Sequence, residues 1–222
     1  WHERDYDNEY KSTTAKLFGT NTHAAILEPH IYRELKVKDS KTTSVDGCIT
    51  RSDQKKIAKI VELVERSNPG WIHNIQTFGR NEFALTWTCL VTGVECKCLI
   101  DSYYENILTD LKTDKDGVDE QFEYTATGKY LYIGQSAMYT DGLIANGMPV
   151  DKTQILALKT QSPLQVGWWE VGKMALEQGR QLYQSLLRLW QATPEQDRVA
   201  LPAHHGTIQP HSSLEPDEIE EF

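Results

Sequence analysis

The sequence of 222 residues lacks any apolar run close to the roughly 20 residues that a membrane-spanning helix requires. Nothing at its N-terminus reads as a signal peptide, and residues 1–200 contain no internal repeat or low-complexity linker. With 39% hydrophobic and 25% charged residues, the composition is that of an ordinary globular domain. Because the chain begins with Trp1 instead of Met, we expect a fragment with further residues upstream.

Cysteine is scarce, and its spacing argues against the common metal motifs. The four cysteines form no C-x-x-C pair, and no histidine stands at zinc-finger spacing: Cys48, Cys89, Cys96 and Cys98. We therefore expect no zinc or iron–sulfur site. Cys96 and Cys98 would share one face of a strand as core residues. Buried free thiols are typical of a reducing cytosol, so we expect a cytoplasmic protein.

An excess of positive charge is also lacking. A net charge of −9 argues against a protein that binds nucleic acid over its whole surface, although basic residues lining one groove would still serve a DNA-active enzyme. Part of this charge lies at the C-terminus, where Glu215 to Phe222 include five acidic residues and no basic one. We expect residues 201–222 to form a flexible acidic tail. The alternative is a docking peptide, because the tail resembles the acidic, phenylalanine-ended tails of single-stranded DNA-binding proteins.

The hydrophobic periodicity predicts an α/β domain over residues 1–200, with a central mixed β-sheet flanked by helices. Helical spacing covers 10–27, 51–67, 128–145 and 173–192, and alternation predicts strands at 83–91, 94–100, 107–113, 154–159 and 165–171. On the last helix we expect an inward face of Met174, Leu182, Leu186 and Leu189. Of Trp168 and Trp169, adjacent on a strand, we expect one in the core and one at the surface.

Three charged residues stand near the ends of two consecutive predicted strands. Asp101 ends one strand, and Asp110 and Lys112 leave the same face of the next. Phosphodiester cleavage uses such a set, because carboxylates hold Mg²⁺ while a lysine steadies the attacking water and the transition state. A D-x-K triplet alone is more often a surface ion pair. Here the triplet follows a predicted hairpin, and Asp110 stands nine residues after another aspartate, Asp101. This position favours an active site.

Further segments occur in an order that resembles the PD-(D/E)XK nuclease superfamily, specifically the exonuclease VIII-like and lambda exonuclease-like recombination nucleases. The matching segments are Phe18-Gly19-Thr20 with His23 and the AAILEP run at 24–29, Glu82 before the T-G turn, Ile100-Asp101 in place of Pro-Asp, Asp110-Leu111-Lys112-Thr113 as D-x-K-T, and Gln135 with Tyr139 as Q-x-x-x-Y. The ordered set covers most of the chain and is more specific than any single motif.

The resemblance implies a restriction-endonuclease-like core and a role for each matched residue. Asp101 and Asp110 would bind the catalytic metal, with the Leu111 carbonyl and His23 as further ligands. Lys112 would activate water. Glu82 and Gln135 would orient metal-bound water or the scissile phosphate. A histidine on an apolar helix face is more often a core residue, but the G-T-x-x-H-A-x-x-L-E-P context favours the ligand.

The same resemblance implies an exodeoxyribonuclease that uses Mg²⁺, with Mn²⁺ as a substitute, and degrades linear double-stranded DNA from its ends, 5′ to 3′. It would act in recombination or phage DNA processing in a bacterial or phage-infected cell, as a homo-oligomeric ring and beside a single-strand annealing or single-stranded DNA-binding partner. Alternatives are an endonuclease or single-strand nuclease on the same core, or a non-catalytic DNA-end or protein-interaction module that uses the acidic tail. Asp101, Asp110 and Lys112 favour an enzyme.

Overall fold

The computed structural model describes residues 14–39, 47–129 and 131–194. The helices are α1 (Thr14–Leu27), α2 (Pro29–Glu34), α3 (Arg51–Ser67), α4 (Trp71–Phe78), α5 (Glu120–Tyr124), the π-helical turn η1 (Thr125–Lys129), α6 (Tyr132–Ala145) and α7 (Lys173–Ala192). The strands are β1 (Lys36–Lys38), β2 (Cys48–Thr50), β3 (Arg80–Thr88), β4 (Glu95–Tyr104), β5 (Ile107–Asp114), β6 (Lys152–Lys159) and β7 (Gln165–Glu170). Within these ranges no helix combines the length and apolarity needed to cross a membrane. The predicted tail, 201–222, lies outside them.

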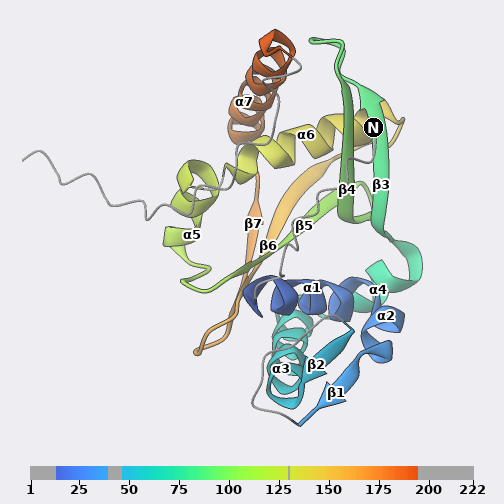
Figure 1. The fold of residues 1–222 in the computed structure, drawn as a ribbon, viewed down its shortest axis with the longest axis vertical. Coiled ribbons are helices and arrows are strands. Elements are labelled where there is room, and N and C mark those ends of the chain that lie inside the picture. The colour runs from blue at the N-terminus through green and yellow to red at the C-terminus, as the bar shows by residue number, and fades with distance from the viewer. Residues whose placement is uncertain (1–13, 40–46, 130, 195–222) are drawn as a thin grey trace, which may run out of the picture.

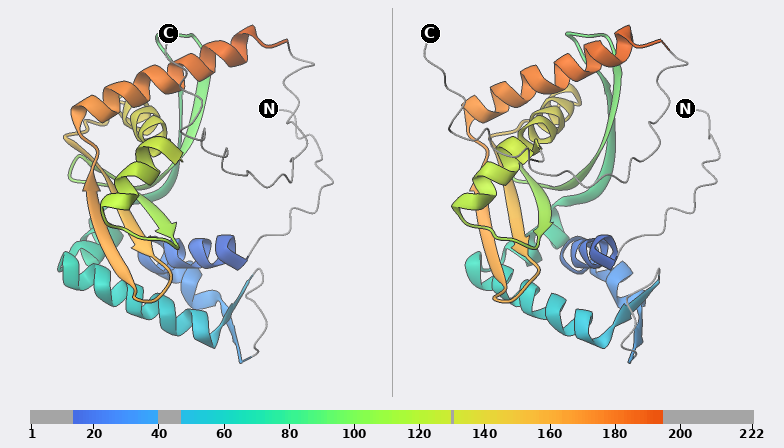
Figure 2. Two further views of the ribbon diagram at one scale, coloured as in Figure 1. Left: turned by 90° about the vertical axis from the view of Figure 1, so that its left-hand side faces the viewer. Right: turned by 60° about the vertical axis from the view of Figure 1, so that its left-hand side comes forward.

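A mixed five-stranded sheet in the order β3-β4-β5-β6-β7 forms the centre of the fold (Figure 1). Its neighbours are antiparallel except for β5 and β6, which run parallel. β1 and β2 form a separate parallel pair. Leu111, Leu156 and Leu158 pack with α1, α3 and α4, whereas Ile155 and Ala157 pack with α5 and the start of α6. Helices therefore cover both faces of the sheet, as the sequence predicts (Figure 2).

Local sequence explains where α1 and α3 begin or end. The Thr50 side chain accepts a hydrogen bond of 3.0 Å from the Asp53 N–H and so caps the start of α3. Pro29 ends α1 and opens α2. Its missing N–H costs nothing there, because an N–H in the first turn of a helix has no partner within the helix. The sequence did not predict α2, α4, α5, β1 or β2, all of which are short.

The predicted inward face of α7 is wrong for three of its four residues. Met174, Leu186 and Leu189 are 78%, 54% and 64% exposed. The helix instead buries Gly179 and Tyr183. A Cβ atom on Gly179 would lie 2.1 Å from the Ile133 carbonyl oxygen, so the absence of a side chain lets α7 approach α6 backbone to backbone.

The prediction that one of the two adjacent tryptophans lies at the surface is also wrong. Both side chains are half-buried, on opposite faces of the sheet. The Trp168 ring meets the Trp71 ring edge-on with centroids 4.8 Å apart, and the Trp169 ring lies 5.9 Å from that of Phe122. Since helices cover both faces of β7, neither tryptophan faces solvent fully.

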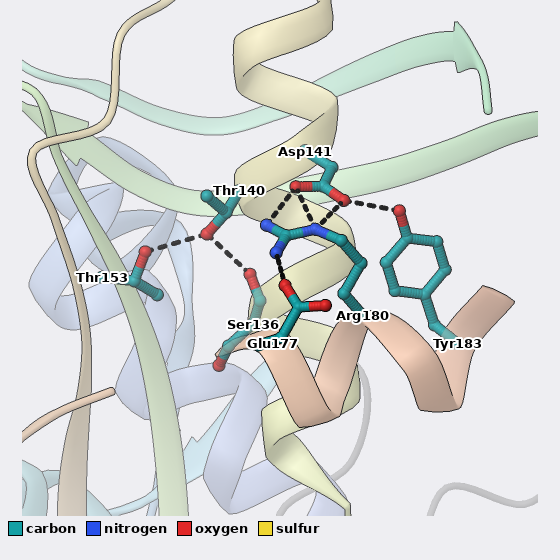
Figure 3. A network of polar contacts seen from close by, with 7 residues as sticks. All are labelled: Ser136, Thr140, Asp141, Thr153, Glu177, Arg180 and Tyr183. Carbon is teal, nitrogen blue, oxygen red and sulfur yellow. Dashed lines mark hydrogen bonds and ion pairs between the residues drawn. The ribbon is translucent and has the colours of Figure 1, made fainter. Parts of the chain in front are cut away.

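A polar network fixes α6 against α7 and against β6 (Figure 3). The Arg180 guanidinium donates to both carboxylate oxygens of Asp141, through Nε at 2.8 Å and Nη2 at 2.7 Å. The Tyr183 hydroxyl donates to the same carboxylate at 2.6 Å. On the sheet side, the hydroxyls of Thr140 and Thr153 lie 2.8 Å apart. These contacts set the position of α6, which carries Gln135 and Tyr139.

Candidate metal centre and active site

The candidate site lies where β4 and β5 separate. The two strands pair only over Ser102–Thr109, Tyr103–Leu108 and Tyr104–Ile107. Asp101 and Asp110 are the next residues on each strand, the first beyond this pairing. From there β4 stays with β3 and β5 stays with β6, so the aspartates stand at the apex of a fork (Figure 1).

At this apex a side-chain hydrogen bond takes the place of the backbone pairing between β4 and β5. The backbone N–H of Leu111 donates to Asp101 Oδ2 at 2.7 Å, where continued pairing would have supplied a backbone carbonyl of β4. The N–H and C=O of one strand residue project to the same side. The Leu111 carbonyl, a predicted metal ligand, therefore faces the same gap.

Three residues bring potential metal ligands together beside the fork. His23 Nδ1 on α1 lies 3.6 Å from Glu82 Oε1 on β3 and 3.9 Å from Asp101 Oδ2 on β4. Ligand atoms of the three side chains all lie within 4.8 Å of one another, and no second group of this kind occurs in the described parts of the chain. One imidazole nitrogen and two carboxylates form a donor set that suits a divalent cation.

Glu82 has a left-handed backbone conformation, with φ of +46°. The β3–β4 pairing continues at Asn81–Ser102 and Phe83–Ile100 but omits the intervening position. For a residue other than glycine this conformation costs about 1–2 kcal/mol and persists only where the surroundings enforce it, most often at functional sites. The strained residue is the one whose carboxylate lies beside His23.

The cluster carries unrelieved negative charge. Burial, followed by the charge of Asp110, raises the pKa of Asp101 to about 7, although His23, Lys112 and the Leu111 N–H act in the opposite direction. Burial lowers the pKa of His23, but the contact with Glu82 and the neighbouring carboxylates outweigh it, so the net shift is upward. A bound cation would relieve this repulsion.

Asp110 lies on the other side of the apex and is only 3% exposed. Its Oδ2 is 2.6 Å from Lys112 Nζ, and its Oδ1 accepts a hydrogen bond of 3.2 Å from Gln135 Nε2. The same Gln135 nitrogen donates to the Tyr139 hydroxyl at 2.8 Å. Lys112 Nζ also lies 5.0 Å from the centre of the Tyr132 ring, within the range of a cation–π contact.

The predicted site residues thus form two adjoining groups. His23, Glu82, Asp101 and the backbone of Leu111 lie together, and Asp110, Lys112 and Gln135 lie next to them. Tyr139 belongs to the matched Q-x-x-x-Y motif, but the resemblance assigned it no role in the site. The structure places its hydroxyl two hydrogen bonds from Asp110.

Two amide side chains that sequence reasoning missed hold His23 in position. Gln76 Nε2 donates to the Ile26 carbonyl at 2.7 Å, which satisfies one of the carbonyls left open at the end of α1. Asn81 Nδ2 donates to the Ile75 carbonyl at 2.9 Å, and its Oδ1 accepts from the Ser102 hydroxyl at 2.8 Å. Asn81 directly precedes Glu82 and Ser102 directly follows Asp101, but no motif marks either pair in the sequence.

A cavity of about 620 Å³ opens beside the cluster. His23, Glu82 and Lys112 line it together with Lys16 and Gly19. A Cβ on Gly19 would lie 3.1 Å from Thr113 Oγ1, so the glycine lets α1 lie close to β5. The space in front of the predicted ligands is large enough for a phosphodiester group and its neighbours.

Comparisons with known proteins bear on the whole chain. The family model of the PDDEXK-like domain of unknown function (DUF3799) matches residues 2–208. The solved structure of a "Putative exonuclease" from Eubacterium rectale superposes with a TM-score of 0.61 at 16% sequence identity, over 91% of this chain and 78% of the other. At this identity the likeness shows the fold. No curated protein matches the chain.

Proposed function

The chain belongs to the family of PDDEXK-like domains, within the PD-(D/E)XK nuclease superfamily that the motifs predicted, and on this premise we propose that it is a metal-dependent exodeoxyribonuclease. It would hydrolyse phosphodiester bonds from the ends of linear double-stranded DNA. The observation that carries the proposal is the convergence of His23, Glu82 and Asp101 beside the Asp110–Lys112 pair. The name of the similar solved structure, an exonuclease, supports action at the ends of a nucleic acid.

The donor set fits a divalent cation, and His23, Glu82 and Asp101 would hold it, with the Leu111 carbonyl and Asp110 at its edge. Carboxylate oxygens suit Mg²⁺, and one imidazole nitrogen among them is equally suited to Mn²⁺. When bound, such an ion supplies charge that stabilises the phosphoryl oxygens and lowers the pKa of a coordinated water.

Lys112 would act on the substrate. Its ammonium group is anchored 2.6 Å from Asp110 Oδ2, and its side chain lines the 620 Å³ cavity. Such a group can donate hydrogen bonds to a phosphoryl oxygen and to the attacking water. Gln135 would act through Asp110, whose carboxylate it holds, so we assign it a positioning role.

Charge limits where the DNA can bind. A chain with a net charge of −9 attracts the phosphate backbone only near its basic residues, and Lys16 and Lys112 line this cavity together with Glu28 and Glu82. We expect weak, salt-sensitive binding to duplex away from the site. From the family resemblance we further propose 5′ to 3′ polarity, a role in recombination or phage DNA processing, a homo-oligomeric ring and a single-strand annealing partner.

The test compares end-labelled linear duplex DNA with closed circular DNA of the same sequence. The purified protein is incubated with Mg²⁺ or EDTA, beside Asp110→Asn, Lys112→Ala and the control Lys115→Ala, whose side chain is 70% exposed. We expect metal-dependent loss of the linear DNA alone, abolished in the first two variants and retained in the control. Cleavage of circular DNA would indicate an endonuclease. Survival of every DNA would refute a nuclease that acts on double-stranded DNA.

A further inference from the structure

We propose that an apolar cavity between β4 and the end of α7 binds unpaired bases of the DNA strand that lies in the active site. This β4–α7 cavity has a volume of about 870 Å³, and its lining includes Leu99, Met138, Tyr139, Leu187 and Trp190. The inference rests on the proposed nuclease function and adds a substrate requirement, a short single-stranded segment next to the scissile bond.

The fork exposes the wall of this cavity. Beyond Asp101, β4 pairs with β3 alone among the described strands. Leu99 stands two residues before Asp101, so both leave the same face of the strand, and its side chain is about half exposed (49%). Its cross-strand partner Ala84 is exposed as well, two residues from Glu82. An uncovered apolar surface therefore begins directly beside the ligand cluster.

The second wall comes from α6 and α7. Figure 2 shows α7 extending over the β3–β4 hairpin, and Gln191 Nε2 at the end of the helix donates to the Thr92 carbonyl at the hairpin tip at 2.9 Å. Leu187 and Trp190 face the cavity from α7, and Trp190 is 48% exposed. The cavity thus runs along the edge of β4 from Val94 to Leu99, with an aromatic ring on its α7 side.

Tyr139 links the β4–α7 cavity to the catalytic residues. Tyr139 lines it, and the Tyr139 hydroxyl accepts from Gln135, which also donates to Asp110. The 620 Å³ cavity, with Lys16 and Lys112, is lined by a separate set of residues. A strand with its phosphate at Lys112 would have basic residues on one side and the apolar, aromatic cavity on the other.

The chemistry of the lining favours bases over backbone. Nucleobases stack on aromatic side chains in a sequence-tolerant way, and single-strand sites combine such platforms with nearby cations. Lys97 supplies a cation at the rim, but Glu95 lies there too and would repel phosphate. Bases inside a duplex are stacked on one another and unavailable. The occupant is therefore an unpaired segment, supplied by a frayed end or an overhang.

The test measures DNA binding in EDTA, where no cleavage occurs. Fluorescence anisotropy compares a single-stranded oligonucleotide, a duplex with an overhang, and a duplex capped by hairpins at both ends. Trp190→Ala and Leu99→Glu, which alter the α7 part and the β4 part of the lining, should weaken binding of the first two about tenfold and leave the capped duplex unchanged. Trp190→Phe should restore binding. The control Leu189→Ala lies on the same helix, 64% exposed and outside the lining, and should bind as the parent does.

Each other outcome overturns the inference. If both variants bind single-stranded DNA as the parent does, the inference is wrong. The nuclease function would still stand, provided that the parent cleaves linear DNA in the presence of metal. Equal loss for all three DNAs would indicate a general defect of the fold. A change in molar mass by light scattering, with DNA binding intact, would identify the cavity as a surface for a second copy or for a peptide paired to β4. Absence of any metal-dependent cleavage would instead refute the proposed function.

Discussion

The carboxylate of Asp101 accepts a hydrogen bond of 2.7 Å from the backbone N–H of Leu111, although their strands no longer pair at that point. One side chain therefore closes the apex of the fork and also contributes charge to the ligand cluster. These two roles can be separated, because an amide oxygen can accept the hydrogen bond without carrying the charge.

Asp101→Asn should make the metal-free protein more stable. The substitution relieves repulsion among buried carboxylates while an acceptor for the Leu111 N–H remains, so we expect the free energy of unfolding to rise by about 1 kcal/mol. Asp101→Ala should lower it by about 1–3 kcal/mol, because the N–H loses its partner. Urea denaturation in EDTA measures both. Equal destabilisation by the two variants would show that repulsion from neighbouring carboxylates does not destabilise the charged Asp101.

The left-handed backbone at Glu82 predicts an unusual ranking of substitutions. Glu82→Gly should be more stable than Glu82→Ala by about 1 kcal/mol, because glycine adopts positive φ without a steric penalty. In an ordinary strand position alanine would be the more stable of the two. Chemical denaturation of both variants decides the matter, and a more stable alanine variant would contradict the strained conformation.

Asn81→Ala should loosen the position of His23. The Ile75 carbonyl and the Ser102 hydroxyl would each lose a hydrogen-bond partner, which should lower the free energy of unfolding by about 1–3 kcal/mol. We also expect weaker metal binding, since α1 would lose the hydrogen bond of 3.4 Å that Asn81 Nδ2 donates to the Leu27 carbonyl. Ser102→Ala removes one bond of this set and should have the smaller effect on both measurements. A variant with unchanged stability and metal affinity would exclude this role for Asn81.

Asp141→Ala should destabilise the contact between α6 and α7. Its carboxylate accepts from Arg180 and Tyr183, and the side chains of the ion pair are 21% and 31% exposed, so a loss of about 1–2 kcal/mol is expected after solvent screening. Glu62→Ala breaks the exposed pair with Arg66 on α3 and should change stability by less than about 0.5 kcal/mol. Thermal melts of both variants test the difference, and similar melting temperatures would count against the network.

The chemistry of the site was readable from the sequence where residues lie on regular strands. Alternation gave Asp110 and Lys112 a common face of β5 and placed Asp101 on the preceding strand, but the predicted strand end at Asp101 was wrong, because β4 continues to Tyr104. The site's geometry was not readable. No local pattern signals that β4 pairs with β5 only from Ser102 onward, or that Glu82 adopts a positive φ. Both features depend on how the strands meet α1 and α4.

Helix packing shows the same limit. The leucines of α7 follow helical spacing, yet the helix buries the side that carries Gly179 and Tyr183. Periodicity identifies apolar residues but gives no weight to a glycine that allows two backbones to approach. The expected surface tryptophan failed for a related reason, since β7 is covered on both faces. The stretch predicted as one helix over 128–145 is divided, because Leu131 has φ of +53° between η1 and α6.

The most direct measurement of the central claim is a calorimetric titration of Mn²⁺ into the metal-free protein and three variants. We predict one binding site whose affinity falls more than about tenfold in His23→Ala and in Asp101→Asn, since even partners outside the ligand shell contribute that much. His30→Ala, an exposed histidine on α2, should bind as the parent does. Equal affinity in all four proteins, or no binding to the parent, would contradict a divalent-metal centre at the fork of β4 and β5.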